Sequence, residues 1–146
     1  MKVSSRHCLL ALGASLLFVS SATSAFAGKP ERDRADDIKP KQEEVQKKFK
    51  ETCGCDVHVN VKFESYATVD DMAYIDQSLD SLSSAASAYC EKEADKKALC
   101  ESLTEVEFSF AKDESTAKLE GKKISVTTGP HSYASDTAFS TILNKF

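Results

Sequence analysis

The sequence predicts an α+β domain in which helices cover an antiparallel sheet of about four strands, in the order α-β-α-β-β-β-α. Segments in which apolar and polar residues alternate gather late in the chain and are separated by short turns, while the helical patterns do not alternate with them one for one. Four cysteines remain once an N-terminal leader is set aside, an even number that favours two disulfides. The predicted fold is therefore disulfide-stabilised.

The first 27 residues have the pattern of a secretory signal peptide. Lys2 and Arg6 precede an apolar run from Leu9 to Val19, and a small-residue A-x-A site ends at Ala27. The run is about half of the roughly 20 residues that span a bilayer. Cys8 precedes the run, so it does not fit a lipoprotein site. We therefore expect cleavage near Ala27 and a secreted or periplasmic protein without stable membrane insertion.

The net charge of the chain limits which classes of partner are expected. Loss of Lys2 and Arg6 leaves 17 basic residues beside all 23 acidic ones, a net charge of −6. A mildly acidic surface argues against nucleic acid or anionic lipid as a partner. No sequence feature indicates the oligomeric state.

The 119 residues after the leader fit a single domain. Residues 28–39 contain many charged residues around a lone Ile38, too little apolar surface to offset the entropy of ordering them. We therefore expect a flexible segment over residues 28–39 and one α+β domain over residues 40–146.

A first helix is predicted from Pro40 to Gly54. Proline is tolerated in a first helical turn, and glycine is suited to end a helix. Val45 and Phe49 lie one turn apart and form a narrow apolar stripe. Such a helix is expected to lie across the surface of another element.

Residues 56–64 have the alternation of a half-buried strand. The apolar set is Val57, Val59, Val61 and Phe63. His58 falls on the opposite, solvent-facing side. A general base needs a positioned neighbour, and none is evident in the sequence, so we interpret His58 as a surface residue.

A long helix is predicted from Thr68 to Tyr89. Thr68 and Asp71 resemble a capping box with aspartate in place of glutamate. Apolar residues then recur at three- and four-residue spacing, which predicts one buried face. They are Met72, Ile75, Leu79, Leu82, Ala86 and Tyr89.

The C-terminal third predicts a meander followed by a helix. Strands are expected over residues 104–110, around Leu119, and around Ile124 and Val126, with turns at residues 113–114 and 120–121. A final helix is expected from Ser135. Its apolar stripe is Phe139, Ile142, Leu143 and Phe146.

The four cysteines Cys53, Cys55, Cys90 and Cys100 allow three pairings. An unbroken helix would separate Cys90 and Cys100 by about 15 Å, whereas a disulfide needs alpha carbons roughly 4.4 to 6.8 Å apart. The charged residues 91–95 predict a break, which favours Cys90 with Cys100 and Cys53 with Cys55. The alternative that Cys53 and Cys55 each reach the long helix stays open.

Cys53-Gly54-Cys55 also permits an enzymatic interpretation, thiol-disulfide exchange. The predicted position at a helix C-terminus argues against it, because the helix dipole there opposes a thiolate. A metal site of Cys53, Cys55 and His58 lacks the spacing of structural zinc sites. The sequence therefore assigns no catalytic residue, metal or cofactor.

Residues 127–135 connect the last strand to the last helix and contain His131 and Tyr133 beside Gly129 and Pro130. The segment is either a plain connection or a binding loop on a rigid scaffold. We expect a non-enzymatic module that binds an unknown protein or small ligand, inhibition included, with thiol-disulfide exchange as the alternative. A binding role predicts an exposed aromatic patch or a free sheet edge.

Overall fold

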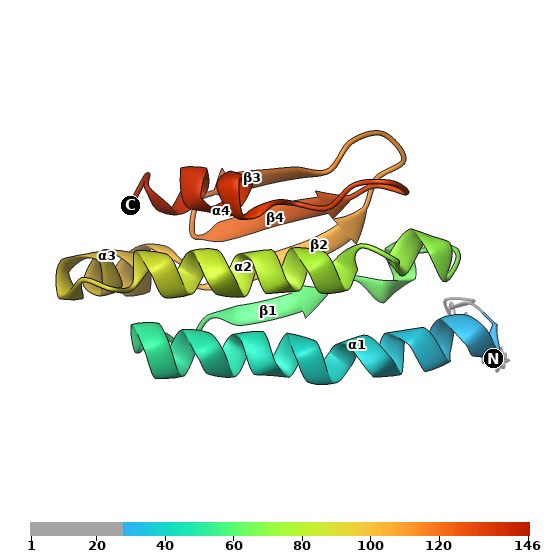
Figure 1. The fold of residues 1–146 in the computed structure, drawn as a ribbon, viewed down its shortest axis with the longest axis horizontal. Coiled ribbons are helices and arrows are strands. Elements are labelled where there is room, and N and C mark those ends of the chain that lie inside the picture. The colour runs from blue at the N-terminus through green and yellow to red at the C-terminus, as the bar shows by residue number, and fades with distance from the viewer. Residues whose placement is uncertain (1–27) are drawn as a thin grey trace, which may run out of the picture.

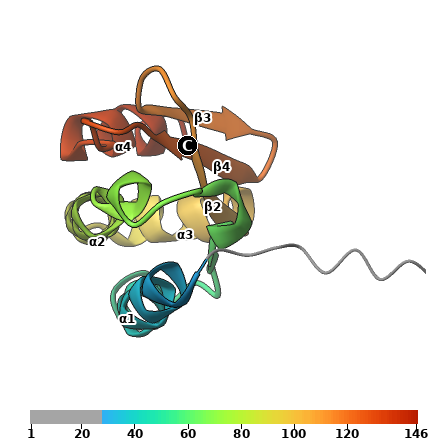
Figure 2. The ribbon, with the colours of Figure 1, turned by 90° about the vertical axis from the view of Figure 1, so that its right-hand side faces the viewer.

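Helix α2 (Ile75–Tyr89) is the middle of a helical layer that lies on one face of a four-stranded sheet (Figures 1 and 2). Helices α1 (Lys29–Lys48) and α4 (Asp136–Leu143) flank it on either side. The computed structural model describes residues 28–146, so the predicted signal peptide and its site at Ala27 lie outside the described residues. Within that range no helix is both long and apolar enough to cross a bilayer.

The sheet is mixed, and the prediction of an antiparallel meander is wrong. Its strands are β1 (His58–Val61), β2 (Glu105–Phe110), β3 (Thr116–Glu120) and β4 (Lys123–Thr128), in the spatial order β1-β2-β4-β3. Strand β2 runs parallel to both β1 and β4, while β3 and β4 form an antiparallel hairpin. Gly121 supplies the positive φ of 64° in that hairpin turn. The long connection through α2 brings the chain back in the same direction, as parallel strands require.

The helix predicted over residues 68–89 divides into several elements. Thr68 and Asp71 form the reciprocal bonds of the capping box, with Asp71 N–H donating to Thr68 Oγ1 at 3.2 Å. The box caps a short 3₁₀ turn, Asp70–Met72, and α2 begins only at Ile75. The predicted break near residues 91–95 is confirmed, because a separate helix α3 (Glu93–Ser102) follows. The element order therefore contains one helix more than predicted.

Residues 28–39, expected to be flexible, instead form the first half of α1. Ile38 is 0 % exposed and Ala35 is also buried. Arg34 of this segment forms an ion pair at 2.6 Å with Asp76 of α2. The segment is ordered by contacts with α2 that its own sparse apolar content does not reveal. Pro40 consequently lies inside the helix and not in its first turn.

The predicted end of the first helix is confirmed. Its last turn is a π-helix, Phe49–Cys53, and Gly54 follows in the left-handed region with φ of 77°. Glycine adopts this conformation without the steric penalty of a Cβ atom.

The alternating residues of the strands that face the helical layer build the core. Val57, Val59 and Val61 are buried, as predicted, and His58 is exposed. At the centre of β2 the ring of Phe108 packs against Phe139 of α4, with centroids 6.5 Å apart. Phe139, Ile142 and Leu143 of the predicted stripe are buried in α4, whereas Phe146 follows the helix and is partly buried. Ser135 caps this helix by accepting a bond from Ala138 N–H.

Two glutamines of α1 occupy the outer edge of β1. Gln42 Nε2 donates to the carbonyl oxygen of Val59 at 2.8 Å, and Val59 N–H donates to Gln46 Oε1 at 2.7 Å. The backbone groups of Val59 that point away from β2 are therefore satisfied by side chains.

The favoured cysteine pairing is wrong. Cys53 pairs with Cys90 and Cys55 with Cys100, at alpha-carbon separations of 5.3 and 5.1 Å. Gly54 turns the chain between the two N-terminal cysteines, so Cys53 reaches the residue after α2 while Cys55 reaches α3. Neither the Cys53–Cys55 ring nor the Cys90–Cys100 staple forms.

Candidate functional site

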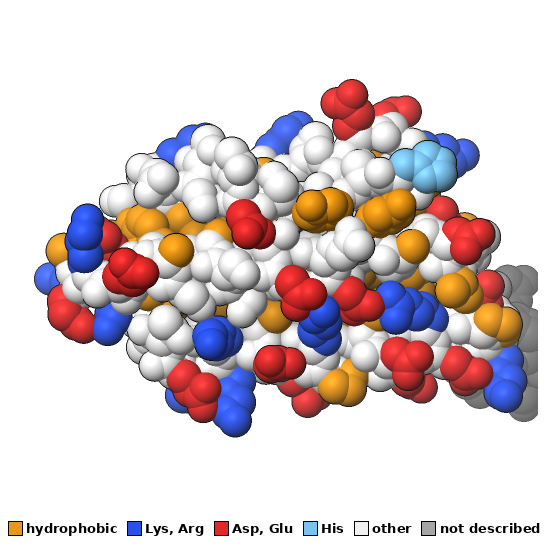
Figure 3. All heavy atoms as spheres, in the orientation of Figure 1, with side chains coloured by type: hydrophobic (Ala, Val, Ile, Leu, Met, Phe, Trp, Pro, Cys, Tyr) orange, Lys and Arg blue, Asp and Glu red, His pale blue; other side chains and the backbone are white. Residues whose placement is uncertain are grey.

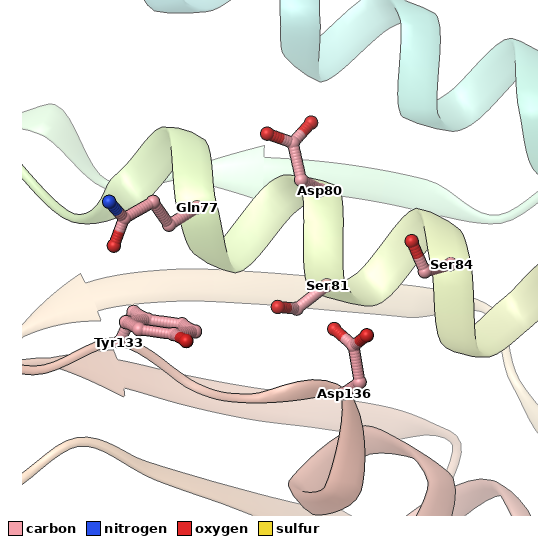
Figure 4. A pocket seen from close by; sticks show the side chains of 6 residues that line it. All are labelled: Gln77, Asp80, Ser81, Ser84, Tyr133 and Asp136. Atoms are coloured by element: carbon pink, nitrogen blue, oxygen red, sulfur yellow. The ribbon is translucent and has the colours of Figure 1, made fainter.

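A groove follows the seam between α2 and α4. At its wider end the groove encloses about 410 Å³, and both helices and the loop before α4 contribute polar side chains (Figure 4). The lining residues are Gln77, Asp80, Ser81, Ser84, Tyr133 and Asp136. We call this depression, together with its continuation described below, the α2–α4 groove.

The loop that carries Tyr133 is anchored at both ends. After Tyr133, the N–H of Ala134 donates to the buried Ser78 Oγ of α2 at 3.1 Å. Before it, Thr128 Oγ1 and the Tyr66 hydroxyl share a buried hydrogen bond of 3.1 Å. Burial raises the pKa of Tyr66 to about 12, so this hydroxyl keeps its proton. Tyr133 is thus presented on a loop tied to the core.

Tyr133 is 45 % exposed and is the only large hydrophobic residue classed as exposed among residues 28–146. Its ring lies along the seam and faces α2 (Figure 4). His131, the other candidate of this loop, is exposed but does not line the groove. The structure therefore places only one of the two sequence candidates at the groove.

Two polar groups of the groove are without a partner among the described residues. The hydroxyl of Ser81, a residue that is 7 % exposed, makes no hydrogen bond with residues 28–146, and its oxygen is accessible from the groove. Asp136, in the first turn of α4, likewise has no ion pair or side-chain hydrogen bond there. Asp80 differs, because it points toward α1 and pairs with Lys41 at 2.7 Å.

The same pair of helices lines a second hollow further along the seam. This hollow encloses about 210 Å³. It is lined by Ala85, Ala88, Tyr89, Ser140 and Asn144. In Figure 3 hydrophobic side chains gather along this seam, whereas charged side chains crowd over α1. The groove is thus polar and acidic at one end and more apolar at the other.

Another hollow, between α1 and the start of β1, contains His58 beside charged residues. Lys50 and Asp56 form an ion pair at 2.8 Å there. The hydrogen bond from Lys50 and its charge lower the pKa of Asp56. Because Lys50 and Asp56 are paired with each other, neither is free to pair with a ligand in this hollow, whereas Asp136 of the α2–α4 groove has no partner among the described residues.

The sheet face opposite the helices carries a charge network centred on Glu107. Lys62 and Lys123 contact its Oε1 at 2.8 and 2.7 Å, and Lys123 also lies 3.8 Å from Glu105. Desolvation acts to raise the pKa of Glu107, but the hydrogen bonds from Lys123 and Lys62 outweigh it, and the pKa is lowered. The network is internally paired and stabilises the sheet.

The lowered pKa of Glu107 makes part of the stability dependent on pH. The ionised carboxylate stabilises the fold above the unfolded-state pKa, near the ordinary value of 4.5, and this contribution is lost as the pH falls through the lower folded-state pKa. When the pH is lowered from about 5 to about 3, we expect the free energy of unfolding to fall less in Glu107→Gln than in the wild type. Urea unfolding at several pH values checks this, with the exposed Glu64→Gln as control. Equal pH dependence in the wild type and Glu107→Gln would contradict the assignment.

The cysteines are held in separate bridges, which gives thiol-disulfide exchange through Cys53-Gly54-Cys55 no geometric support. Cys53, Cys55 and Cys90 are buried, and Cys100 is exposed. Cys53 ends its helix, where the dipole opposes a thiolate. Within residues 28–146 no three histidine, cysteine or carboxylate side chains are grouped to hold a metal ion.

Comparisons with protein-family models, with curated proteins and with solved structures each find no match. The assignment of a function therefore depends on the geometry of the groove.

The sequence interpretation missed most of the groove. None of Ser81, Ser84 and Asp136 was predicted as a site residue, because nothing in their local pattern indicates that α2 and α4 lie side by side. The available signal was the run of small residues between Ser81 and Ala88, which lets another element approach α2 closely.

Proposed function

We propose that this protein is a non-enzymatic binding module whose ligand, a protein or small molecule, occupies the α2–α4 groove. A secreted or periplasmic location is part of the proposal, because two disulfides fit an oxidising compartment. The observation that carries it is the exposed ring of Tyr133, held on an anchored loop near the Ser81 hydroxyl, which is accessible from the groove and has no partner among the described residues. An exposed aromatic residue beside accessible polar groups is typical of a recognition site.

The geometry supports binding better than catalysis. A nucleophilic serine needs an adjacent base, and neither His58 nor His131 lines the groove. Asp136 could accept a proton, but neither a hydrogen bond with Ser81 nor a third orienting group is present among the described residues. The groove instead offers hydrogen-bond acceptors, a hydroxyl and an aromatic surface, which suit recognition.

Fragment binding observed by NMR tests this proposal. We expect a mixed set of cationic, anionic and neutral fragments to shift the backbone amides of Ser81, Ser84 and Tyr133 more than those of the sheet face opposite the helices. Tyr133→Ala should weaken the groove-binding fragments by about tenfold, since the ring supplies much of the contact area. Thr141→Ala, an exposed position of α4 that does not line the groove, is the control. Shifts confined to the open sheet face, or unchanged by Tyr133→Ala, would overturn the proposal.

A further inference from the structure

We propose that the α2–α4 groove takes an extended segment of a partner protein and recognises it through a basic side chain seated between the Tyr133 ring and the Asp136 carboxylate. This inference rests on the proposed function and specifies the chemistry of the ligand.

The charges of the groove favour a cation. Its lining residues include two carboxylates and no lysine or arginine. Lys41 already neutralises Asp80, but Asp136 has no cationic partner among the described residues. A bound ammonium or guanidinium group would complete that pair, whereas an anionic ligand would be repelled.

The uncharged groups at the same end suit the same ligand. Ser81 as a residue is 7 % exposed, and its hydroxyl is accessible from the groove, lacks a partner within residues 28–146, and faces the seam beside Asp136 (Figure 4). Its oxygen can accept a hydrogen bond from a cationic N–H group. The face of a tyrosine ring attracts a cation within about 6 Å of its centroid. The Tyr133 ring, the Ser81 hydroxyl and the Asp136 carboxylate thus lie around the same end of the groove (Figure 4).

The length of the groove favours a polypeptide over a small cation. From Asp136 to Asn144 the α4 side of the groove extends over eight residues, or about 12 Å of helix. An extended chain rises about 3.3 Å per residue, so about four residues fit along the seam. The far end, with Ala85, Ala88 and Tyr89, suits small apolar side chains next to the basic one.

Blocked tetrapeptides test the inference. The probes are acetylated and amidated Lys-Ala-Ala-Ala and Arg-Ala-Ala-Ala, with norleucine and glutamate versions as matched controls and lysine amide as the free cation. We expect the lysine and arginine peptides to shift the amides of Ser81, Tyr133 and Asp136 in NMR titrations. Their affinity should exceed that of the norleucine and glutamate peptides at least tenfold and should fall as salt is added.

Substitutions in the groove measure the contribution of the Asp136 charge separately from that of the Tyr133 ring. Asp136→Asn should weaken the lysine peptide about tenfold and leave the norleucine peptide unchanged, while Tyr133→Leu should weaken the lysine peptide more than Tyr133→Phe does. Asp37→Asn removes an exposed carboxylate of α1 that lines neither hollow and should change nothing. The dispersion of the amide spectrum shows whether each variant is folded.

The outcomes distinguish this inference from the proposed function. Equal binding of the lysine and norleucine peptides in the groove, or an unchanged affinity in Asp136→Asn, would overturn cation recognition while binding in the groove stands. Lysine amide that binds as tightly as the lysine peptide would overturn the extended segment. If neither the peptides nor the fragments shift the groove amides, both the inference and the proposed function fail.

Discussion

Joint replacement of Cys53 and Cys90 by alanine is expected to lower the free energy of unfolding by about 4 kcal/mol. The bridge joins residues 37 positions apart, and its removal returns the entropy of that loop to the unfolded chain. The variant also loses a connection between the end of the first helix and the residue after α2. Urea unfolding followed by circular dichroism measures the change. A loss below about 1 kcal/mol would contradict it.

A second double variant tests which cysteines are paired. In the observed connectivity, Cys53→Ala with Cys55→Ala leaves Cys90 and Cys100 without their partners, so two free thiols are expected within residues 28–146. Cys53→Ala with Cys90→Ala leaves the other bridge intact and should yield no free thiol there. A local Cys90–Cys100 bridge would give the reverse pattern, and thiol counting with mass mapping decides between the two.

Ile38→Ala is expected to lower the free energy of unfolding by about 2 to 4 kcal/mol. Ile38 is 0 % exposed, and truncation of its side chain removes apolar contacts and leaves a cavity. If residues 28–39 were flexible, the same substitution would leave the free energy of unfolding nearly unchanged. Urea unfolding of this single variant therefore separates an ordered α1 from a flexible N-terminal segment.

Asp37→Ala is the matched control for this experiment. The residue is the immediate neighbour of Ile38, is exposed, and has no side-chain partner among the described residues. Its replacement should change the free energy of unfolding by less than about 0.5 kcal/mol. Equal effects of the two substitutions would mean that a local change of helix propensity, and not burial, is being measured.

The parts of the fold that local patterns determine could be predicted from the sequence. The alternation of Val57, Val59 and Val61 identified β1, and the spacing of Ile75, Leu79 and Leu82 identified the buried face of α2. The direction of strand pairing could not be predicted in this way, because alternation shows which side of a strand is buried but not which strand lies beside it. The sequence of residues 28–39 likewise does not show that α1 begins there, because contacts with α2 order this segment.

The residues of the candidate site also differ in whether the sequence alone could reveal them. Tyr133 could be found from the sequence because it lies in a loop with glycine and proline before a capped helix. Ser81 and Asp136 belong to different helices, and only their tertiary placement makes them neighbours. The cysteine pairing likewise depended on the positions of three separate elements, which spacing along the chain does not encode.

The two glutamines of α1 have a consequence for how molecules of this protein can associate. Gln42 and Gln46 stand where the backbone of a further strand would lie beside Val59, so they hinder the addition of a strand at that position. Strand β3 is the opposite border of the sheet. Two copies that met there, strand against strand, would cover the β3 edge of both molecules. Within residues 28–146, a contact of this kind therefore favours a pair of molecules over a fibre.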